Sequence, residues 1–262
     1  MNRNLRPIRG PILSLLVALT QAVALAADTG TTPREQADGQ ALALEVRSLQ
    51  PASTTTNRAT LEIRNASGKR QRIPVVIETV APAPNSDRWS TRYLAGSSDA
   101  GTSEILEIVQ RAEATPEYRL QGPQETTASQ VAATATGRSF AGSDFSLADL
   151  GLEFLHWPQQ RLIPAPKDHP HMVKGRSCRV LESRNPSGSP YSRVVSWIDL
   201  EFRGLIQADA YDARGQLLKQ FSVGSFKKVD GVWMLKDMEI LDDQKGTKTR
   251  LEFELTVPRD PR

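Results

Sequence analysis

The strongest constraint on the fold is an alternation of apolar and polar residues with a period of two. Its clearest instance is residues 250–257, whose apolar positions are Leu251, Phe253, Leu255 and Val257. Successive side chains of a β-strand point to opposite faces of a sheet, so this pattern is typical of a strand with one buried face and one face in water. The chain is therefore expected to be mainly β.

The first half of the chain contains a hairpin pattern, in which two alternating segments flank a polar turn at residues 65–69. The apolar positions of these two segments are Ala59, Leu61, Ile63, Ile73, Val75 and Ile77. Further strands are expected near residues 89–94, 105–111 and 117–121. Residues 122–139 are polar and are expected to be weakly structured.

The second half predicts an antiparallel meander, because short polar turns separate its alternating segments. The expected strands are residues 179–183, 191–198, 206–211, 216–226, 232–241 and 250–257. Helices are expected only at residues 38–48 and 146–154, the second with Ser146 and Asp149 as a capping box. Two short helices would cover a sheet of this size poorly, so its apolar face is expected to receive further cover or a ligand.

Residues 1–26 have the three parts of a secretory signal peptide. Three arginines, at positions 3, 6 and 9, precede an apolar run over residues 12–26, which ends in the small-x-small pattern Ala24-Leu25-Ala26. Cleavage is expected before Ala27. An uncleaved anchor is the alternative, but the run is short and interrupted for a membrane span. The sequence therefore predicts export to the periplasm.

The remainder predicts one domain of residues 41–257, because 262 residues are enough for one large core. Residues 27–40 are small and polar and are expected to be a flexible mature N-terminus, and residues 258–262 a short tail. The whole chain has 33 basic and 30 acidic residues, but three of the basic ones lie in the signal. The mature chain is thus neutral, which argues against a nucleic-acid partner.

Candidate catalytic and metal-binding residues are few. Asp144 and Asp149 could act as paired acid and base, but capping of a helix is the simpler interpretation because no nucleophile stands at a defined spacing. His169 and His171 beside Asp168 form a metal-ligand pattern, for which a solvated loop is the favoured alternative. Neither a catalytic residue nor a metal or cofactor is therefore predicted.

Cys178 is the only cysteine of the chain and lies among apolar residues of an expected strand. It is interpreted as a small buried apolar side chain, and a single cysteine excludes an intrachain disulfide. An enzyme, for example a lipid hydrolase, would need His156, Asp144 and a serine within hydrogen-bond reach of one another. No G-x-S-x-G motif is present to support that hypothesis.

Several ordered motifs resemble the LolA-like outer-membrane lipoprotein-sorting family. The segment FAGSDFSLADL at residues 140–150 resembles the family's GSDFSYEDL-type motif, with Gly142, Ser143, Asp144 and Phe145 at its centre. Three further family segments have similar stretches in this chain, at residues 175–182, 189–199 and 211–219. The family's closing hairpin resembles residues 230–233 and 246–249. The order and spacing agree from about residue 138 to 257. The family's WLYLP stretch is not visible in the front half.

The resemblance implies a mainly β (α+β) fold: an antiparallel meander curled into an incomplete β-barrel, with a few lid helices and a concave face that receives acyl chains. It also implies a non-catalytic carrier of lipoprotein acyl chains or another lipid, with an inner-membrane exporter or outer-membrane receptor as partner. Combining it with the alternation, we expect the lining residues Leu61, Ile63, Val75, Ile77, Ile206, Met234, Met238, Leu251, Phe253 and Leu255.

A second hypothesis remains open from the same residues. The chain could be a non-catalytic periplasmic interaction subunit, associated with a resistance-nodulation-division-type exporter as some relatives are. In that case its sheet would be plugged by its own front half. The first hypothesis requires space for a lipid on the apolar face, and the second predicts that protein side chains fill it.

Overall fold

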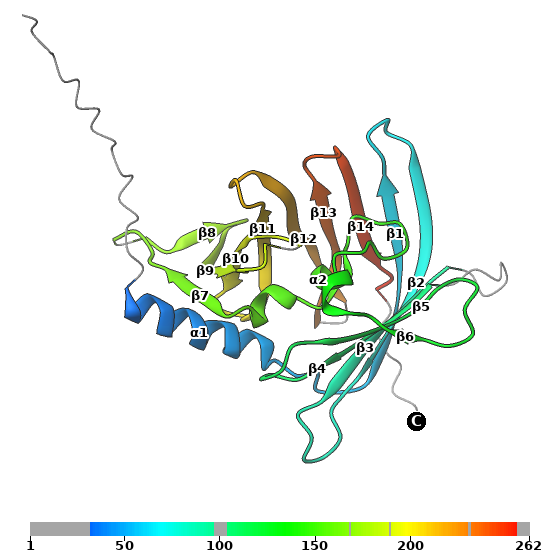
Figure 1. The fold of residues 1–262 in the computed structure, drawn as a ribbon, viewed down its shortest axis with the longest axis horizontal. Helices are drawn as coiled ribbons and strands as arrows, with labels where there is room; N and C mark the ends of the chain where they lie inside the picture. Colours follow the sequence, from blue (N-terminus) through cyan, green and yellow to red (C-terminus); the bar gives the residue numbers. More distant parts are fainter. Residues whose placement is uncertain (1–31, 97–103, 168, 189, 230–231, 256–262) are drawn as a thin grey trace, which may run out of the picture. The chain divides into compact units, whose positions relative to one another are not determined.

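The computed structural model describes residues 32–96, 104–167, 169–188, 190–229 and 232–255. The predicted signal at 1–26 and the tail at 258–262 lie outside these residues. The described part is built on one antiparallel sheet of 14 strands that curls without closing (Figure 1). The predicted mainly β half-barrel is thus confirmed.

The front half of the chain supplies one side of this sheet. Its strands are β1 (Thr55–Arg64), β2 (Arg70–Val80), β3 (Trp89–Ala95), β4 (Glu104–Gln110), β5 (Glu117–Gln121) and β6 (Ser129–Gln130). The predicted hairpin around residues 65–69 is confirmed, since Leu61 pairs with Ile73 and Ala59 with Val75. The expected strands near 89–94, 105–111 and 117–121 are also present.

The back half supplies the other side. Its strands are β7 (Gln159–Ile163), β8 (His171–Val173), β9 (Arg176–Arg184), β10 (Arg193–Asp199), β11 (Leu205–Tyr211), β12 (Leu217–Val229), β13 (Val232–Asp242) and β14 (Thr247–Phe253). All six expected strands are present, although β14 ends at Phe253 rather than Val257. β7 and β8 were not predicted, because neither segment alternates clearly.

The order of the strands is β6-β5-β4-β3-β2-β1-β14-β13-β12-β11-β10-β9-β7, with β8 paired to β9. The first and last strands therefore pair in the middle, where Leu61 lies opposite Leu251. The chain leaves the middle through β1, reaches one edge at β6 and starts again at the other edge with β7. Residues 131–158 make this crossing and contain η2 (Ala133–Ala135), α2 (Leu147–Leu150) and η3 (Glu153–His156).

One face of the sheet is apolar across most of its width. A row of paired residues runs through six neighbouring strands, and its members are Leu162, Leu181, Ser196, Ala208, Phe221 and Ile240. The buried apolar side chains form two clusters, one beneath α2 and one beneath α1 and η3, and Phe221 packs against both. We call this continuous apolar surface the inner face.

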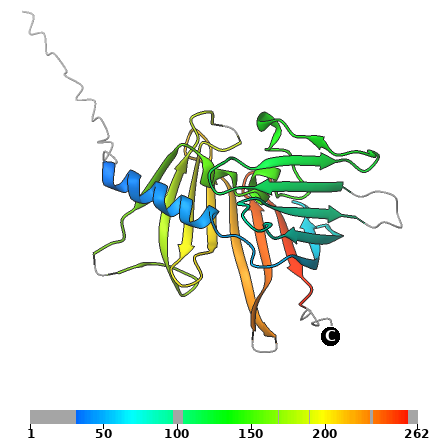
Figure 2. The same cartoon turned by 90° about the horizontal axis from the view of Figure 1, so that it is seen from below.

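The helix α1 (Pro33–Arg47) lies along β7 at the edge of the sheet (Figure 2). It starts with a capping box, in which Thr32 and Glu35 bond each other's backbone N–H groups, and with Pro33 in its first turn. The prediction of a flexible segment up to residue 40 is therefore wrong from Thr32 onwards. Apolar periodicity predicts a helix only from residue 38, because the first turn of α1 is polar and is stabilised by its capping box.

In the described residues, no helix is long and apolar enough to cross a membrane.

Gly39 allows α1 to approach β7 closely, because a Cβ atom at this position would lie 2.6 Å from backbone atoms of Arg161. Alanine normally favours a helix by about 1 kcal/mol over glycine. Here we expect Gly39→Ala to lower the free energy of unfolding by about 1–3 kcal/mol through overpacking, measured by urea denaturation. Gln36→Ala, at an exposed position of the same helix, is the control. A Gly39→Ala variant at least as stable as wild type would contradict this packing.

Candidate functional site

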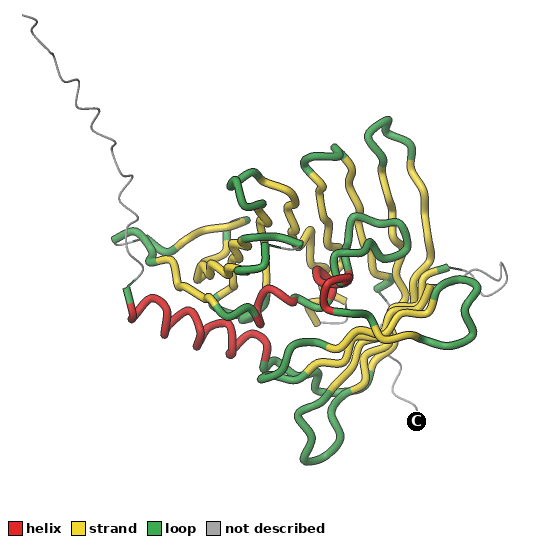
Figure 3. The backbone as a smooth tube through the Cα atoms, in the orientation of Figure 1, coloured by secondary structure: helices red, strands yellow, loops and turns green. Residues whose placement is uncertain are grey.

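The inner face is covered by the crossing segment and by α1. We call residues 140–156 of the crossing segment the cap. Phe140, Phe145 and Leu147 are fully or almost fully buried against the first cluster, and Phe154 and Leu155 against the second. Figure 3 shows the red turns of α2 and η3 within the curl of the yellow strands. The sequence predicted further cover or a ligand on this face, and residues of the crossing segment, many of them non-helical, provide the cover.

Most of the predicted lining residues lie on this covered face. Four are buried in the first cluster and two more are partly buried against it, namely Leu61, Val75, Ile77, Leu251, Met238 and Phe253. Ile206 is buried at one end of the face, outside both clusters. Ile63, Met234 and Leu255 are half-buried and belong to neither cluster. The structure thus brings six of the ten together, but beneath the cap rather than in an open cavity.

A polar contact at Asp144 fastens the cap to the middle of the sheet. The Asp144 carboxylate accepts hydrogen bonds from Thr247 Oγ1 (2.5 Å) and Thr249 Oγ1 (2.8 Å) on β14. The Asp144 backbone N–H donates to Thr249 Oγ1 at 2.9 Å, and Thr249 is 0% exposed. Because Asp144 and Thr249 are buried, each needs its partner, and the contact fixes the position of the cap.

A second contact holds the other side of α2. Lys219 Nζ on β12 donates to the backbone oxygen of Asp144 at 2.6 Å and to Asp149 Oδ2 at 3.1 Å. Tyr191 OH donates to Asp149 Oδ1 at 2.8 Å. Asp149 also closes the predicted capping box with Ser146, which confirms the capping interpretation of this carboxylate.

The motif residues Gly142, Ser143, Asp144 and Phe145 build the turn that presents these contacts. Gly142 has a φ of 68° with nothing within 4 Å of an added Cβ, so its backbone conformation rather than space calls for glycine. Ser143 Oγ donates to the backbone oxygen of Phe140 at 2.6 Å. The turn therefore points Phe140 and Phe145 to the sheet while Asp144 reaches the threonines.

The end of the cap lies against the last turn of α1. Arg47 Nη1 donates to the backbone oxygen of Leu155 at 3.0 Å. Burial, and then the nearby Arg47 charge, lower the pKa of His156 to about 4. His156 lines two cavities beside α1, of about 250 and 490 Å³. It shares no hydrogen bond with Asp144 in the described part of the chain, so the constellation needed for a hydrolase is not assembled.

One groove on the inner face is open. It has a volume of about 640 Å³ and is lined by residues of β11 and β12. It lies at the end of the sheet that carries the β8–β9 turn. Ile206 and Val223 form its buried floor, and Phe202 and Phe226 line it as exposed aromatic side chains. Lys174 comes from the β8–β9 turn, and Arg176 is the first residue of β9. We call this the rim groove; it fits an apolar ligand in size and lining.

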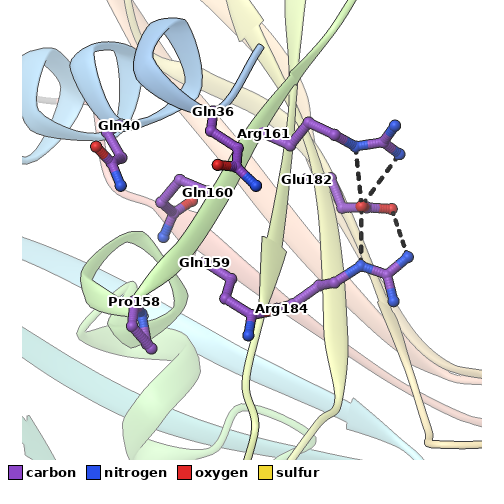
Figure 4. A pocket seen from close by; sticks show the side chains of 8 residues that line it. All are labelled: Gln36, Gln40, Pro158, Gln159, Gln160, Arg161, Glu182 and Arg184. Atoms are coloured by element: carbon purple, nitrogen blue, oxygen red, sulfur yellow. Dashed lines mark hydrogen bonds and ion pairs between the residues drawn. The ribbon is translucent and has the colours of Figure 1, made fainter. Parts of the chain in front are cut away.

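A further depression of about 170 Å³ is polar (Figure 4). Glu182 lies beside it and pairs with Arg161 at 3.1 Å, Arg184 at 3.0 Å and Arg193 at 3.3 Å. Burial alone would raise the pKa of Glu182, but the arginines lower it overall. This charged cluster is satisfied internally and offers no surface to an acyl chain.

The other candidate residues of the sequence form neither a catalytic nor a metal-binding group within the described residues. Cys178 is buried, and burial raises the pKa of its thiol, which makes it a poor nucleophile. The described residues contain no group of three metal-ligating side chains. His169 is exposed and His171 is half-buried, with Nε2 3.2 Å from the backbone oxygen of Pro164, while Asp168 lies outside the described residues.

Solved structures with the same fold cover most of the chain. A DUF1329 family protein from Desulfovibrio piger has a TM-score of 0.67 at 20% identity, over 84% of this chain and 91% of its own. A domain from Vibrio parahaemolyticus, described as an outer membrane lipoprotein-sorting protein, has a TM-score of 0.67 at 18% identity, over 84% and 92%. A LolA superfamily protein from Nitrosomonas europaea has a TM-score of 0.56 at 13% identity, over 86% and 94%.

The fold is therefore that of the LolA-like half-barrel proteins, as the sequence motifs predicted. A protein-family model with the description "Uncharacterized protein" matches residues 86–261, and the chain belongs to that family. A search of curated proteins finds no match.

The Asp144 contact predicts how the cap is held. Asp144→Ala would leave the hydroxyls of Thr247 and Thr249 without their acceptor, so we expect the free energy of unfolding to fall by about 1–3 kcal/mol. We also expect faster proteolytic cleavage within residues 140–156. Asp87→Ala, at an exposed position, is the control. Unchanged stability and unchanged cleavage in Asp144→Ala would show that the contact does not hold the cap.

The lowered pKa of His156 predicts a dependence of stability on pH. In the unfolded chain His156 takes up a proton below about pH 6.5, whereas in the folded chain it does so only below about pH 4. The free energy of unfolding should therefore decrease by about 2 kcal/mol as the pH is lowered through this interval. The decrease is smaller than the full pKa shift implies, because solvent screens the partly exposed ring. Urea unfolding of wild type and His156→Gln across this range measures it. Parallel pH profiles would contradict the assignment.

Proposed function

We propose that this protein is a periplasmic carrier that shields the acyl chains of a lipoprotein or of another lipid on its inner face. The observation that carries the proposal is the continuous apolar face of an unclosed sheet, which ends in the open rim groove. The likeness of the fold to a LolA superfamily protein and to a lipoprotein-sorting domain supports it. The predicted signal at residues 1–26 would bring the chain to the periplasm.

Because the cap occupies the inner face, a lipid that binds there has to displace it. An acyl chain of a dozen carbons gains about 10 kcal/mol from burial of its methylenes, before the costs of association. Phe140, Phe145 and Leu147 of the cap gain about 5–9 kcal/mol from burial on the same face. The two terms are of similar size, so a lipid can displace the cap and the cap can displace the lipid. A carrier needs this balance, because it has to release what it binds.

The proposal requires no catalytic group, since shielding depends on buried apolar area alone. Lipid would enter when the cap lifts, beginning at the rim groove where the inner face is already open. Release would follow when a receptor offers the acyl chains a better apolar site and the cap returns. An inner-membrane exporter or an outer-membrane receptor is the expected partner.

A cross-linked cap tests this mechanism. Asp144→Cys with Thr249→Cys replaces two side chains that contact each other directly, since Thr249 Oγ1 donates to the Asp144 carboxylate at 2.8 Å, and oxidation is expected to join the two thiols in a disulfide. Cys178→Ala removes the native thiol. We expect the reduced protein to bind a triacylated lipopeptide in native mass spectrometry, and the oxidised protein to bind at least tenfold less. The same chain in its two redox states is the matched control.

Equal binding in both states would show that the cap need not move. A wild-type protein that neither retains lipid on purification nor takes up the lipopeptide would contradict the carrier function itself.

The covered inner face favours a second candidate. A face filled by the chain's own side chains suits the non-catalytic interaction subunit, which needs no space for lipid. That candidate predicts a clean protein without bound lipid that associates with a membrane exporter. Mass spectrometry of the purified wild-type protein separates the two candidates.

A further inference from the structure

Exposed apolar side chains gather at one end of the sheet. Of the seven exposed large apolar side chains in the described part of the chain, four lie on the β8 strand, the β10–β11 turn and the end of β12. They are Met172, Leu200, Phe202 and Phe226. Together with Lys227 and Lys228 we call them the rim patch. Exposed apolar groups concentrated in this way mark an interaction surface.

The contacts of the backbone place these segments side by side. The β8 residue Met172 pairs with Ser177, and the backbone N–H of Leu200 donates to the Ser177 oxygen at 3.0 Å. Lys174 Nζ reaches from the β8–β9 turn to the backbone oxygen of Val223 on β12 at 2.5 Å. The three segments therefore form one continuous edge around the rim groove.

Two aromatic rings stand at the centre of this edge. Phe202 is 54% exposed and Phe226 43%, and their rings stack with centroids 6.5 Å apart. The Arg176 guanidinium lies 4.5 Å from the centre of the Phe202 ring. Stacking holds the two rings against each other. Their exposure to water costs free energy, and burial against a partner would remove that cost.

The charge around the rings is positive. Arg176 pairs with both Asp199 and Glu201, so these three side chains together carry one net negative charge, which the three lysines nearby exceed. Lys174, Lys227 and Lys228 are exposed and share no ion pair within the described residues. Residues 227–236 of the hairpin contain three lysines and one acid in the sequence. The partner that complements this surface is thus apolar inside and negatively charged at its boundary.

We propose that the rim patch docks the protein onto a membrane surface that contains anionic lipids. Aromatic side chains favour the interface between headgroups and acyl chains, and lysines beside them bind the anionic headgroups. The patch lies at one end of the strands, and the β12–β13 hairpin extends there beyond its neighbours (Figure 2). Docking would bring the rim groove to the lipid. The inference rests on the surface alone and stands even if the inner face binds no acyl chain.

The test is cosedimentation of the full mature chain with vesicles. We expect wild type to bind vesicles of mixed phosphatidylcholine and phosphatidylglycerol more tightly than vesicles of phosphatidylcholine alone, and to lose this preference in 1 M salt. Lys227→Gln with Lys228→Gln should weaken binding to the anionic vesicles about thirtyfold. Phe202→Ser with Phe226→Ser should weaken it about tenfold or more, whereas leucine at both positions should largely retain it.

The matched control is Lys69→Gln with Arg214→Gln, which removes the same charge from exposed turns at the opposite end of the strands. This variant should bind like wild type. Equal weakening in the control and in the lysine variant would overturn the proposal, as would wild-type binding that ignores lipid charge. Loss of a dimer in the serine variant, seen by analytical ultracentrifugation, would assign the patch to a second copy instead.

Discussion

The pairing of β1 with β14 in the middle of the sheet determines the rest of the structure. Because the first and last strands are neighbours, the two halves of the chain spread outward to opposite edges. The chain then has to cross from β6 to β7, and it crosses over the apolar face. The cap is thus a consequence of the topology, and the surface it covers is the one that a lipid would need.

Two kinds of interaction hold the cap, and they respond differently to a ligand. The apolar side chains Phe140, Phe145 and Leu147 bind by buried area, which an acyl chain can replace. The contacts of Asp144 and Asp149 with β14, β12 and Tyr191 depend on geometry, which an acyl chain cannot reproduce. In the proposed carrier, the apolar part would therefore allow the exchange with lipid, and the polar part would define the position to which the cap returns.

The sequence predicted what depends on local pattern. Alternation located the hairpins, and the spacing of Ser146 and Asp149 located the capping box at the start of α2. The start of α1 was missed because its stabilisation comes from the capping of Thr32 and the close approach of Gly39 to β7, which apolar periodicity does not reveal. The sequence left open whether protein or a ligand covers the inner face, because the answer depends on which strands form the edges, and alternation within a strand does not specify its neighbours.

The central claim is that the cap and an acyl chain compete for the inner face. Hydrogen–deuterium exchange of the cap, with and without a saturating triacylated lipopeptide, tests it most directly. The amides of Asp144, Leu147 and Ala148 are bonded to Thr249, Arg138 and Thr136 while the cap is closed. The account predicts that these amides exchange faster when lipid is bound, while those of β1 and β14 do not. Unchanged or slower exchange of the cap in the presence of bound lipid would contradict it.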